Sequence, residues 1–209
     1  MKLFYGISPF LHTRQGSWAQ SRLLCVARIA AWTPALFLVG AYNLHSQESG
    51  HPEYEVKAAY LYNFGRFVGW PSKPPSDEAG SFAICVLGHD PFGTTLDATL
   101  AGEAIDGKSV VLRRISKPQD TSNCRILFIS ASEGSQLKEI LARLDKMSVL
   151  TVSDIPQFTR RGGMVQFILE ENKVRFEINL AAAERAGLSL SSQLLKVAAN
   201  VTRNPQPGD

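Results

Sequence analysis

Two apolar runs, each about as long as one β-strand, constrain the fold of this chain most strongly. Residues 82–87 read FAICVL, and residues 125–130 read RILFIS with four apolar residues in a row. Such runs are typical of strands that are covered on both faces of a sheet. Segments with helical spacing follow both runs, at residues 92–100 and 137–144. This alternation predicts an α/β sandwich built on a mixed sheet.

The expected sheet has about six strands, of which the last two form the clearest pattern. Residues 173–178 alternate strictly, with Val174, Phe176 and Ile178 on one face and charged residues on the other. Together with residues 164–169 they predict an antiparallel β-hairpin. The remaining strands are expected at residues 82–87, 109–115, 125–130 and 149–152.

Capping residues predict two helices after this hairpin. Asn179 can begin the first helix and Gly187 can end it in a left-handed conformation. Ser189 or Ser191 can begin the second, which is expected to carry Leu194, Leu195, Ala198 and Val201.

An aromatic-rich helix is expected at residues 53–71, EYEVKAAYLYNFGRFVGWP. Its apolar residues Val56, Tyr60, Phe64 and Phe67 recur every three or four positions and so share one face. One interpretation is a core helix packed on the sheet. Another is that part of this surface receives a partner protein, because large apolar patches usually mark binding sites. The candidate partner surface is Tyr60, Phe64, Phe67 and Trp70.

The first 46 residues resemble a secretory signal peptide with its processing region. Three arginines precede the apolar run at residues 29–42, and no acidic residue occurs before Glu48. Cleavage is expected after Ala41 or after Ser46, and an uncleaved membrane anchor is the alternative. The predicted division is therefore a leader at 1–46, one α/β domain at 47–204 and a tail at 205–209.

Charge and cysteine content are consistent with an exported domain. The leader holds 4 of the 22 Lys and Arg residues and none of the 19 Asp and Glu residues, so the mature part carries 18 − 19 = −1. A near-neutral domain without a basic stripe argues against nucleic-acid binding. Cys85 and Cys124 would remain after processing. In an oxidising compartment they are expected to form a disulfide, and two buried thiols are the alternative.

A disulfide between Cys85 and Cys124 would also restrict the order of the strands. Its α-carbons must lie about 4.4–6.8 Å apart, and neighbouring strands lie about 4.8 Å apart. The strand at 82–87 should then neighbour the strand at 125–130, which gives a sheet order of 2-1-3.

Catalytic and metal-binding motifs are absent from the sequence, so we expect no enzyme, no metal and no cofactor. There is no G-x-S-x-G, P-loop, G-x-G-x-x-G or H-E-x-x-H motif. Polar residues that follow predicted strands could line a small pocket, or they could be ordinary turn residues. These candidate ligand loops contain Gly88, His89, Asp90, Ser153, Asp154, Gly162 and Gly163.

Six blocks of the sequence occur in an order that resembles the YfiR-like family of periplasmic proteins. They are KAAYLYNFGRFVGWP, FAICVLGHDPFG, CRILFIS, VLTVSD, GGMVQF and VRFEINLAAAERAGLSLSSQLLKVA. The resemblance covers about residues 53–201 and implies an exported α/β domain, often dimeric, without known catalysis. The best-known members repress an inner-membrane diguanylate cyclase and thereby tune cyclic-di-GMP signalling and biofilm formation.

The resemblance also bears on the cysteines and on the partner. Cys85 and Cys124 match a cysteine pair of such members, whereas Thr159 and Gln166 stand where some members carry a second pair. The implied partner is a diguanylate cyclase or a sensor kinase of the inner membrane, bound by a homodimer. A periplasmic small-ligand-binding protein is the alternative function, and a hydrolase with His89 as its base is a third hypothesis.

Overall fold

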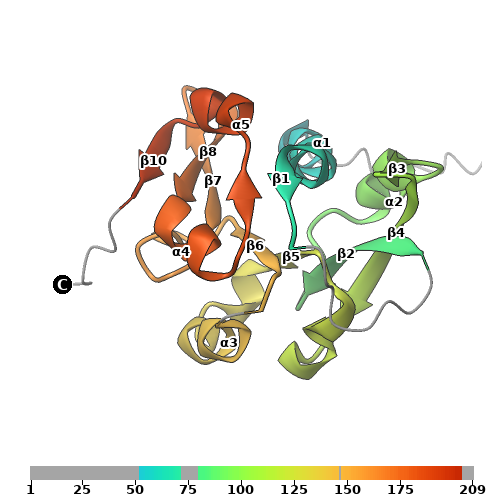
Figure 1. Cartoon of the computed structure of the whole chain (residues 1–209), viewed down its shortest axis with the longest axis horizontal. Helices are drawn as coiled ribbons and strands as arrows, with labels where there is room; N and C mark the ends of the chain where they lie inside the picture. Colours follow the sequence, from blue (N-terminus) through green and yellow to red (C-terminus); the bar gives the residue numbers. More distant parts are fainter. Residues whose placement is uncertain (1–51, 72–79, 146, 204–209) are drawn as a thin grey trace, which may run out of the picture. The chain divides into compact units, whose positions relative to one another are not determined.

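The computed structural model describes residues 52–71, 80–145 and 147–203. The predicted leader and the tail at 205–209 lie outside the described residues. The described part contains helices α1 to α5, two short 3-10 helices (η1 and η2) and strands β1 to β10 (Figure 1). In chain order they are α1 (Pro52–Phe67), β1 (Val68–Gly69), β2 (Ser81–Leu87), α2 (Thr94–Leu100), β3 (Ala104–Ile105), β4 (Lys108–Ile115), η1 (Pro118–Asn123), β5 (Ile126–Ile129), η2 (Ala131–Glu133), α3 (Leu137–Leu144), β6 (Leu150–Ser153), β7 (Val165–Glu170), β8 (Lys173–Asn179), α4 (Leu180–Arg185), β9 (Ser189–Leu190), α5 (Ser192–Val197) and β10 (Asn200–Thr202).

The main sheet is mixed and has eight strands in the order β10-β8-β7-β6-β5-β2-β4-β3. Strands β4, β2, β5, β6 and β7 run parallel to one another, and β7 and β8 form the predicted antiparallel hairpin. The neighbours β4, β2 and β5 confirm the 2-1-3 order. The expected count of about six strands was too low, because β3 and β10 are short strands at the two edges and have no apolar run of their own. Strands β1 and β9 form a separate two-stranded sheet.

Two apolar clusters cover the two faces of the main sheet. The first contains buried residues of α1, α2, α4 and α5, and the second contains buried residues of α3 with the two disulfide-bonded cysteines. Figure 1 shows α1 and α5 on one side of the sheet and α3 on the other. The uninterrupted apolar strands β2 and β5 follow from this arrangement, since alternate side chains enter opposite clusters.

Helix α1 buries a different face from the one that its aromatic spacing predicted. Its buried residues are Lys57, Ala58, Leu61, Phe64 and Gly65, whereas Val56 is exposed. The small residues Ala58 and Gly65 favour burial of this face, because they allow the α1 backbone to approach the core closely. A Cβ atom on Gly65 would overlap Cδ1 of Ile105, so glycine lets α1 lie this close to β3 with the full Ile105 side chain in place.

The disulfide and η1 organise the short connection from β4 to β5. Cys124 directly follows η1, and it forms a disulfide with Cys85 of β2 with a Cα–Cα distance of 5.9 Å. The six residues of η1 supply the parallel crossover between strands that both pair with β2.

The capping residues act largely as predicted at the end of the chain. The Asn179 side chain accepts a hydrogen bond from the Ala182 N–H, and Ser191 accepts one from the Leu194 N–H. Gly187 has a φ of 74° after α4. The expected last helix was too long: α5 ends at Val197, and Val201 belongs to β10, which pairs with β8.

Candidate functional site

Two pockets lie along α1, one between this helix and α5 and the other beside the β7–β8 hairpin. The first, here called the α5 pocket, has a volume of about 290 Å³. The residues of the α5 pocket are mostly aromatic or aliphatic, and none carries a charge. They are Tyr60, Asn63, Phe64, Phe67, Phe176, Gln193, Leu194 and Val197.

The second pocket, here called the hairpin pocket, lies beside the tip of the β7–β8 hairpin. It is more open, has a volume of about 620 Å³ and is lined by Pro52, Glu53, Val56, Leu169, Asn172, Lys173 and Val174. The walls of the two pockets follow one another along the same elements, because residues 56 and 60 are one turn apart on α1, and residues 174 and 176 lie on the same face of β8. We call the two pockets together the α1 groove.

The exposed large apolar side chains of the described residues all line this groove. Val56 is 44% exposed, Leu169 is 57% exposed and Val197 is 58% exposed. Single exposed apolar residues are ordinary on protein surfaces, but a group of them around one concave surface is typical of a binding site. The chain therefore places its accessible apolar surface along α1.

Aromatic contacts fix the floor of the α5 pocket. The Tyr60 ring lies 5.2 Å from the Phe176 ring, and Phe64 stacks against Phe167 at 5.9 Å. Such pairs hold ring positions more firmly than burial alone. Asn63 and Gln193 add two side-chain amides, of which the Asn63 amide donates to the Ala59 carbonyl at 2.9 Å.

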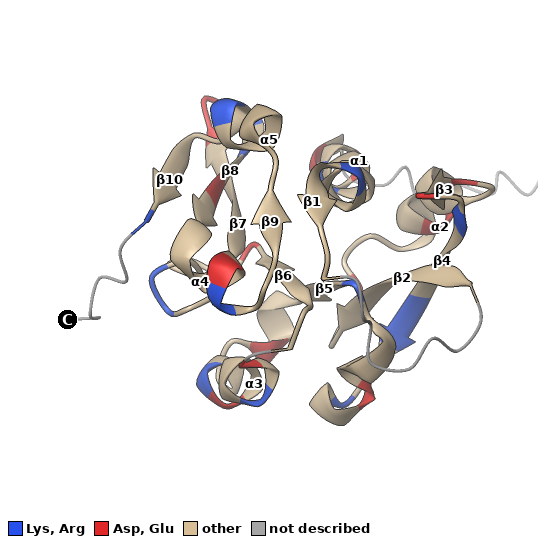
Figure 2. Cartoon of the chain, viewed as in Figure 1, with Lys and Arg blue, Asp and Glu red and all other residues tan. Residues whose placement is uncertain are grey.

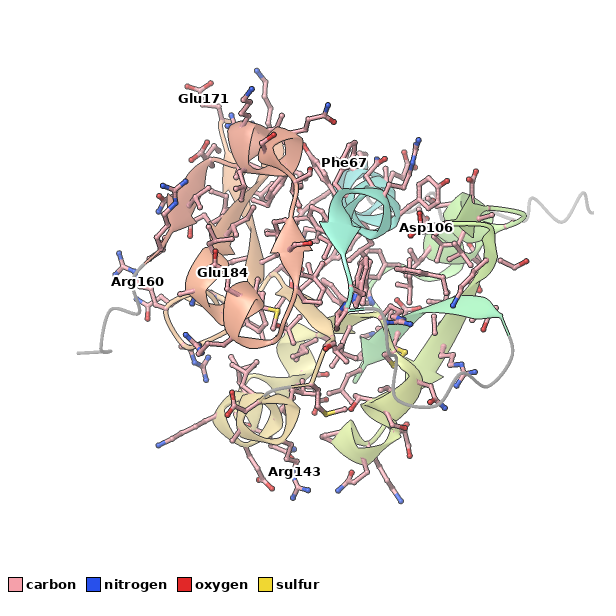
Figure 3. The ribbon with its side chains drawn as sticks, viewed as in Figure 1. Phe67, Asp106, Arg143, Arg160, Glu171 and Glu184 are labelled. Atoms are coloured by element: carbon pink, nitrogen blue, oxygen red, sulfur yellow. A yellow bond between two sulfur atoms is a disulfide. The ribbon has the colours of Figure 1, made fainter. Side chains whose placement is uncertain are left out.

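The structure brings together three of the four candidate partner residues. Tyr60 and Phe67 are half-buried in the wall of the α5 pocket, and Figure 3 marks Phe67 at the end of α1. Phe64 is fully buried, so it supports the pocket from below, and its expected place on an exposed surface is corrected. Trp70 lies outside both pockets and packs edge-on against Phe82 at 5.2 Å.

Several groove residues could not be predicted from the sequence, because they follow the ordinary apolar pattern of the strand or helix that contains them. Leu169 and Val174 follow the hairpin's apolar pattern, and Val197 is one apolar residue in a short helix. Their shared position beside α1 depends on how the hairpin and α5 pack, which local spacing does not encode.

A buried cluster around Lys57 fixes the first half of α1 to the sheet. Lys57 is 3% exposed, and its Nζ atom lies 2.7 Å from Oδ2 of Asp154 and 2.5 Å from Oε1 of Glu53. The Tyr54 hydroxyl donates to the same Asp154 oxygen at 3.0 Å. Burial, with the nearby Asp154 carboxylate, raises the Tyr54 pKa well above its usual range, so the hydroxyl remains a donor. The sequence analysis did not predict this cluster.

The candidate ligand loops after β2 are occupied by contacts within the chain. The His89 N–H donates to Oγ of Ser132 at 3.0 Å, and a Cβ atom on Gly88 would overlap that same oxygen. Asp90 accepts from the Phe92 N–H and from Nε of Arg114, both at 2.7 Å. These bonds are those of turn and capping residues.

The remaining candidate loop residues lie at two other places. Oγ of Ser153 donates to the Ile129 carbonyl at 2.6 Å, and Asp154 belongs to the Lys57 cluster. Gly162 lies beside Leu141 of α3, and the Phe158 ring fills the space where a Gly163 side chain would stand. The seven residues therefore do not converge on one pocket.

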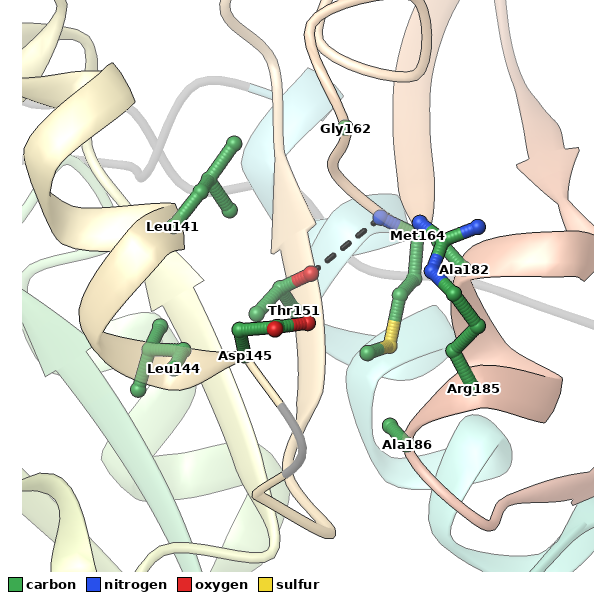
Figure 4. A pocket seen from close by; sticks show the side chains of 9 residues that line it. All are labelled: Leu141, Leu144, Asp145, Thr151, Gly162, Met164, Ala182, Arg185 and Ala186. Carbon is green, nitrogen blue, oxygen red and sulfur yellow. Dashed lines mark hydrogen bonds between the residues drawn. The ribbon is translucent and has the colours of Figure 1, made fainter. Parts of the chain in front are cut away.

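A small pocket with a mixed polar and apolar lining, which includes Gly162, lies between α3 and α4 (Figure 4). Figure 4 shows Asp145 next to Thr151 and Arg185 on the side of Met164, and the Thr151 hydroxyl accepts a hydrogen bond from the Met164 N–H at 3.1 Å. Its volume of about 40 Å³ suits a few water molecules. It is far smaller than the roughly 300–1,000 Å³ of pockets that bind metabolites.

Other functional chemistry is sparse in the described residues. No group of three or more His, Cys, Asp or Glu side chains is placed to hold a metal ion. In residues 52–71, 80–145 and 147–203, no helix has both the length and the apolar character needed to cross a membrane. Figure 2 shows basic and acidic residues interspersed over the helices.

Thr159 and Gln166 contact each other in the structure. Oε1 of Gln166 accepts hydrogen bonds from the Thr159 N–H at 3.3 Å and from the Thr159 hydroxyl at 3.5 Å. Asn179 donates to the Thr159 carbonyl at 2.9 Å. Hydrogen bonds between Thr159 and Gln166 thus hold the loop before β7 against β7 itself.

Comparison with known proteins shows the family of the chain and finds solved structures that are similar to it. The model of the YfiR/HmsC-like family matches residues 54–199. No curated protein matches the chain at a significant level. A solved structure of a conserved domain protein from Vibrio cholerae O1 biovar El Tor str. N16961 is similar, with 12% sequence identity and a TM-score of 0.46. The match covers 71% of this chain and 60% of that one.

Proposed function

Since the chain belongs to the YfiR/HmsC-like family, we propose that it is a periplasmic regulatory binding protein that represses a membrane-anchored diguanylate cyclase or a related sensor. It binds the periplasmic segment of that partner and thereby tunes cyclic-di-GMP signalling and biofilm formation. The family match supports a regulatory role rather than a catalytic one. The leader at residues 1–46 directs export in this proposal.

The observation that carries the binding role is the α1 groove. Val56 and Leu169 are exposed in the hairpin pocket and Val197 in the α5 pocket, and the α5 pocket has no charged lining. Burial of apolar surface drives most protein association. A protein that acts by contact needs such a surface and needs no converging catalytic groups.

The test is a gene deletion in the bacterium that encodes the chain. Loss of the repressor should raise cyclic-di-GMP and biofilm mass, and a plasmid copy of the wild-type gene should restore both. Cell fractionation of the complemented strain should recover the mature chain with the periplasmic proteins. Unchanged cyclic-di-GMP in the deletion strain would refute the proposal.

The homodimer is part of this proposal and has a separate measurement. Light scattering of the purified mature chain should give about twice the mass of one copy across a tenfold range of concentration. A monomer mass throughout that range would remove the dimer from the proposal without affecting the repressor role.

A further inference from the structure

We infer that the α1 groove receives the apolar face of an amphipathic helix of the partner, with a large apolar side chain in the α5 pocket and an acidic residue beside Lys173. This inference rests on the proposed function, because it names the part of the membrane protein that the groove binds. It follows from the polar groups, the length and the charge of the groove.

The backbone hydrogen bonds along the groove favour a helix over an extended peptide as its occupant. Beyond its first turn, the backbone N–H groups of α1 are bonded within the helix, and the carbonyls of Phe67 and Phe176 already accept from the N–H groups of Ser191 and Ala199 at 2.9 and 2.8 Å. An extended segment would lose water from its own backbone and find few partners, at a cost of about 1–3 kcal/mol for each buried group. A helix satisfies its backbone internally and presents side chains alone.

The length of the groove corresponds to several turns of a partner helix. Its α1 wall extends from Pro52 to Phe67, which is 16 residues, or about 24 Å at about 1.5 Å per residue. A cavity of about 150 Å³ is enough for a benzene ring. The α5 pocket, at about 290 Å³, therefore accepts one large aromatic or aliphatic side chain with space for part of another.

The charge of the groove determines which residue types of the partner helix lie at each end of the groove. No charged residue lines the α5 pocket, whereas Glu53 and Lys173 line the hairpin pocket. The Glu53 carboxylate is paired with Lys57, and Lys173 forms no ion pair within the described part of the chain. An acidic residue of the partner therefore complements the hairpin pocket, and uncharged apolar residues complement the α5 pocket.

Site-specific photo-crosslinking in living cells tests this assignment. A photoreactive phenylalanine analogue is placed in the full chain at Val56, at Val197 or, as a control, at Ala142. Ala142 is exposed on α3, against the opposite face of the sheet. We expect the adducts from positions 56 and 197 to map, by mass spectrometry, to one periplasmic stretch of a membrane signalling protein, at sites about 7–14 residues apart. The control should give no such adduct.

A synthetic peptide of that stretch provides the second readout. It should gain helical circular dichroism on binding the purified chain, and a proline at its centre should abolish the gain. Val197→Asp should weaken binding at least tenfold, and the matched variant Ala142→Asp should bind as wild type does. Both changes are at exposed positions, so unchanged thermal unfolding verifies the fold.

Results that overturn helix binding in the α1 groove can be told apart from results that overturn the repressor role. Adducts with a second copy of this chain would overturn the inference and make the groove a dimer contact. Adducts with the membrane protein from position 142 alone would also overturn it, although the repressor role would stand. Absence of any adduct from positions 56 and 197, in cells where gene deletion raises cyclic-di-GMP, would have the same consequence.

Discussion

The Nζ atom of Lys57 lies 2.7 Å from Oδ2 of Asp154, and this ion pair joins the second turn of α1 to the chain immediately after β6. Lys57 is 3% exposed, so its charge depends on protein partners rather than on water. The pair therefore holds the N-terminal half of α1 against the end of β6.

Removal of the Asp154 charge should destabilise the domain. Asp154→Asn leaves Glu53 as the remaining carboxylate partner of Lys57, so we expect a loss of about 1–3 kcal/mol in the free energy of unfolding. Urea unfolding at neutral pH measures it. The exposed pair Arg143–Glu139 gives the control, since Glu139→Gln should cost under about 1 kcal/mol. Equal losses in the two variants would contradict the importance of the buried pair.

The disulfide should contribute about 2–4 kcal/mol to stability. Its cysteines are 39 residues apart, and a crosslink over such a loop restricts the unfolded chain. Guanidinium unfolding of the oxidised protein and of the variant Cys85→Ala/Cys124→Ala should differ by this amount. A thiol assay of the oxidised sample must first show no free thiol. Superimposed unfolding curves would show that the bond does not stabilise the fold.

An alanine at position 65 should destabilise the domain although alanine favours helices. The helix propensity gain is at most about 1 kcal/mol, and overpacking of a core costs about 1–3 kcal/mol. The overlapping atom is the terminal methyl of Ile105, so Ile105→Val should recover part of the loss in the double variant. Thermal unfolding of the wild type, the two single variants and the double variant gives the interaction energy between residues 65 and 105. Purely additive effects would show that the two residues do not compete for the same space.

The Asp97 carboxyl should titrate below its usual pKa of 3.8, because Arg114 donates a hydrogen bond to it. Since the folded-state pKa is lowered, this contact stabilises the fold above about pH 4 and loses its effect as the pH falls through the folded-state pKa. A carboxyl-detected NMR titration measures the pKa directly. In the variant Arg114→Gln the pKa of Asp97 should be higher than in the wild type. An unchanged Asp97 titration in that variant would contradict the assignment.

The sequence predicted the elements whose pattern is local. The apolar runs of β2 and β5, the alternation of β8 and the Asn179 cap all depend on neighbouring residues, and each is present in the structure. Edge strands β3 and β10 were missed because pairing, rather than composition, makes them strands.

The candidate site could be predicted only in part, for the same physical reason. Aromatic spacing identified Tyr60 and Phe67, but it could not tell which side of α1 meets the core. That orientation is set by Gly65 against Ile105 and by Lys57 against Asp154, which are contacts between distant parts of the chain. Leu169 and Val197 join the site through the same tertiary packing.

The close fit of Gly65 against Ile105, together with the Lys57 ion pairs, has a thermodynamic consequence for recognition. A helix held at both ends is already arranged before any encounter, so association needs little reorganisation of this chain. Any drop in heat capacity beyond that expected from the apolar area buried between the two proteins should then come from ordering of the partner helix and not from folding of this chain. Most of the conformational entropy lost on complex formation will be that of the partner helix.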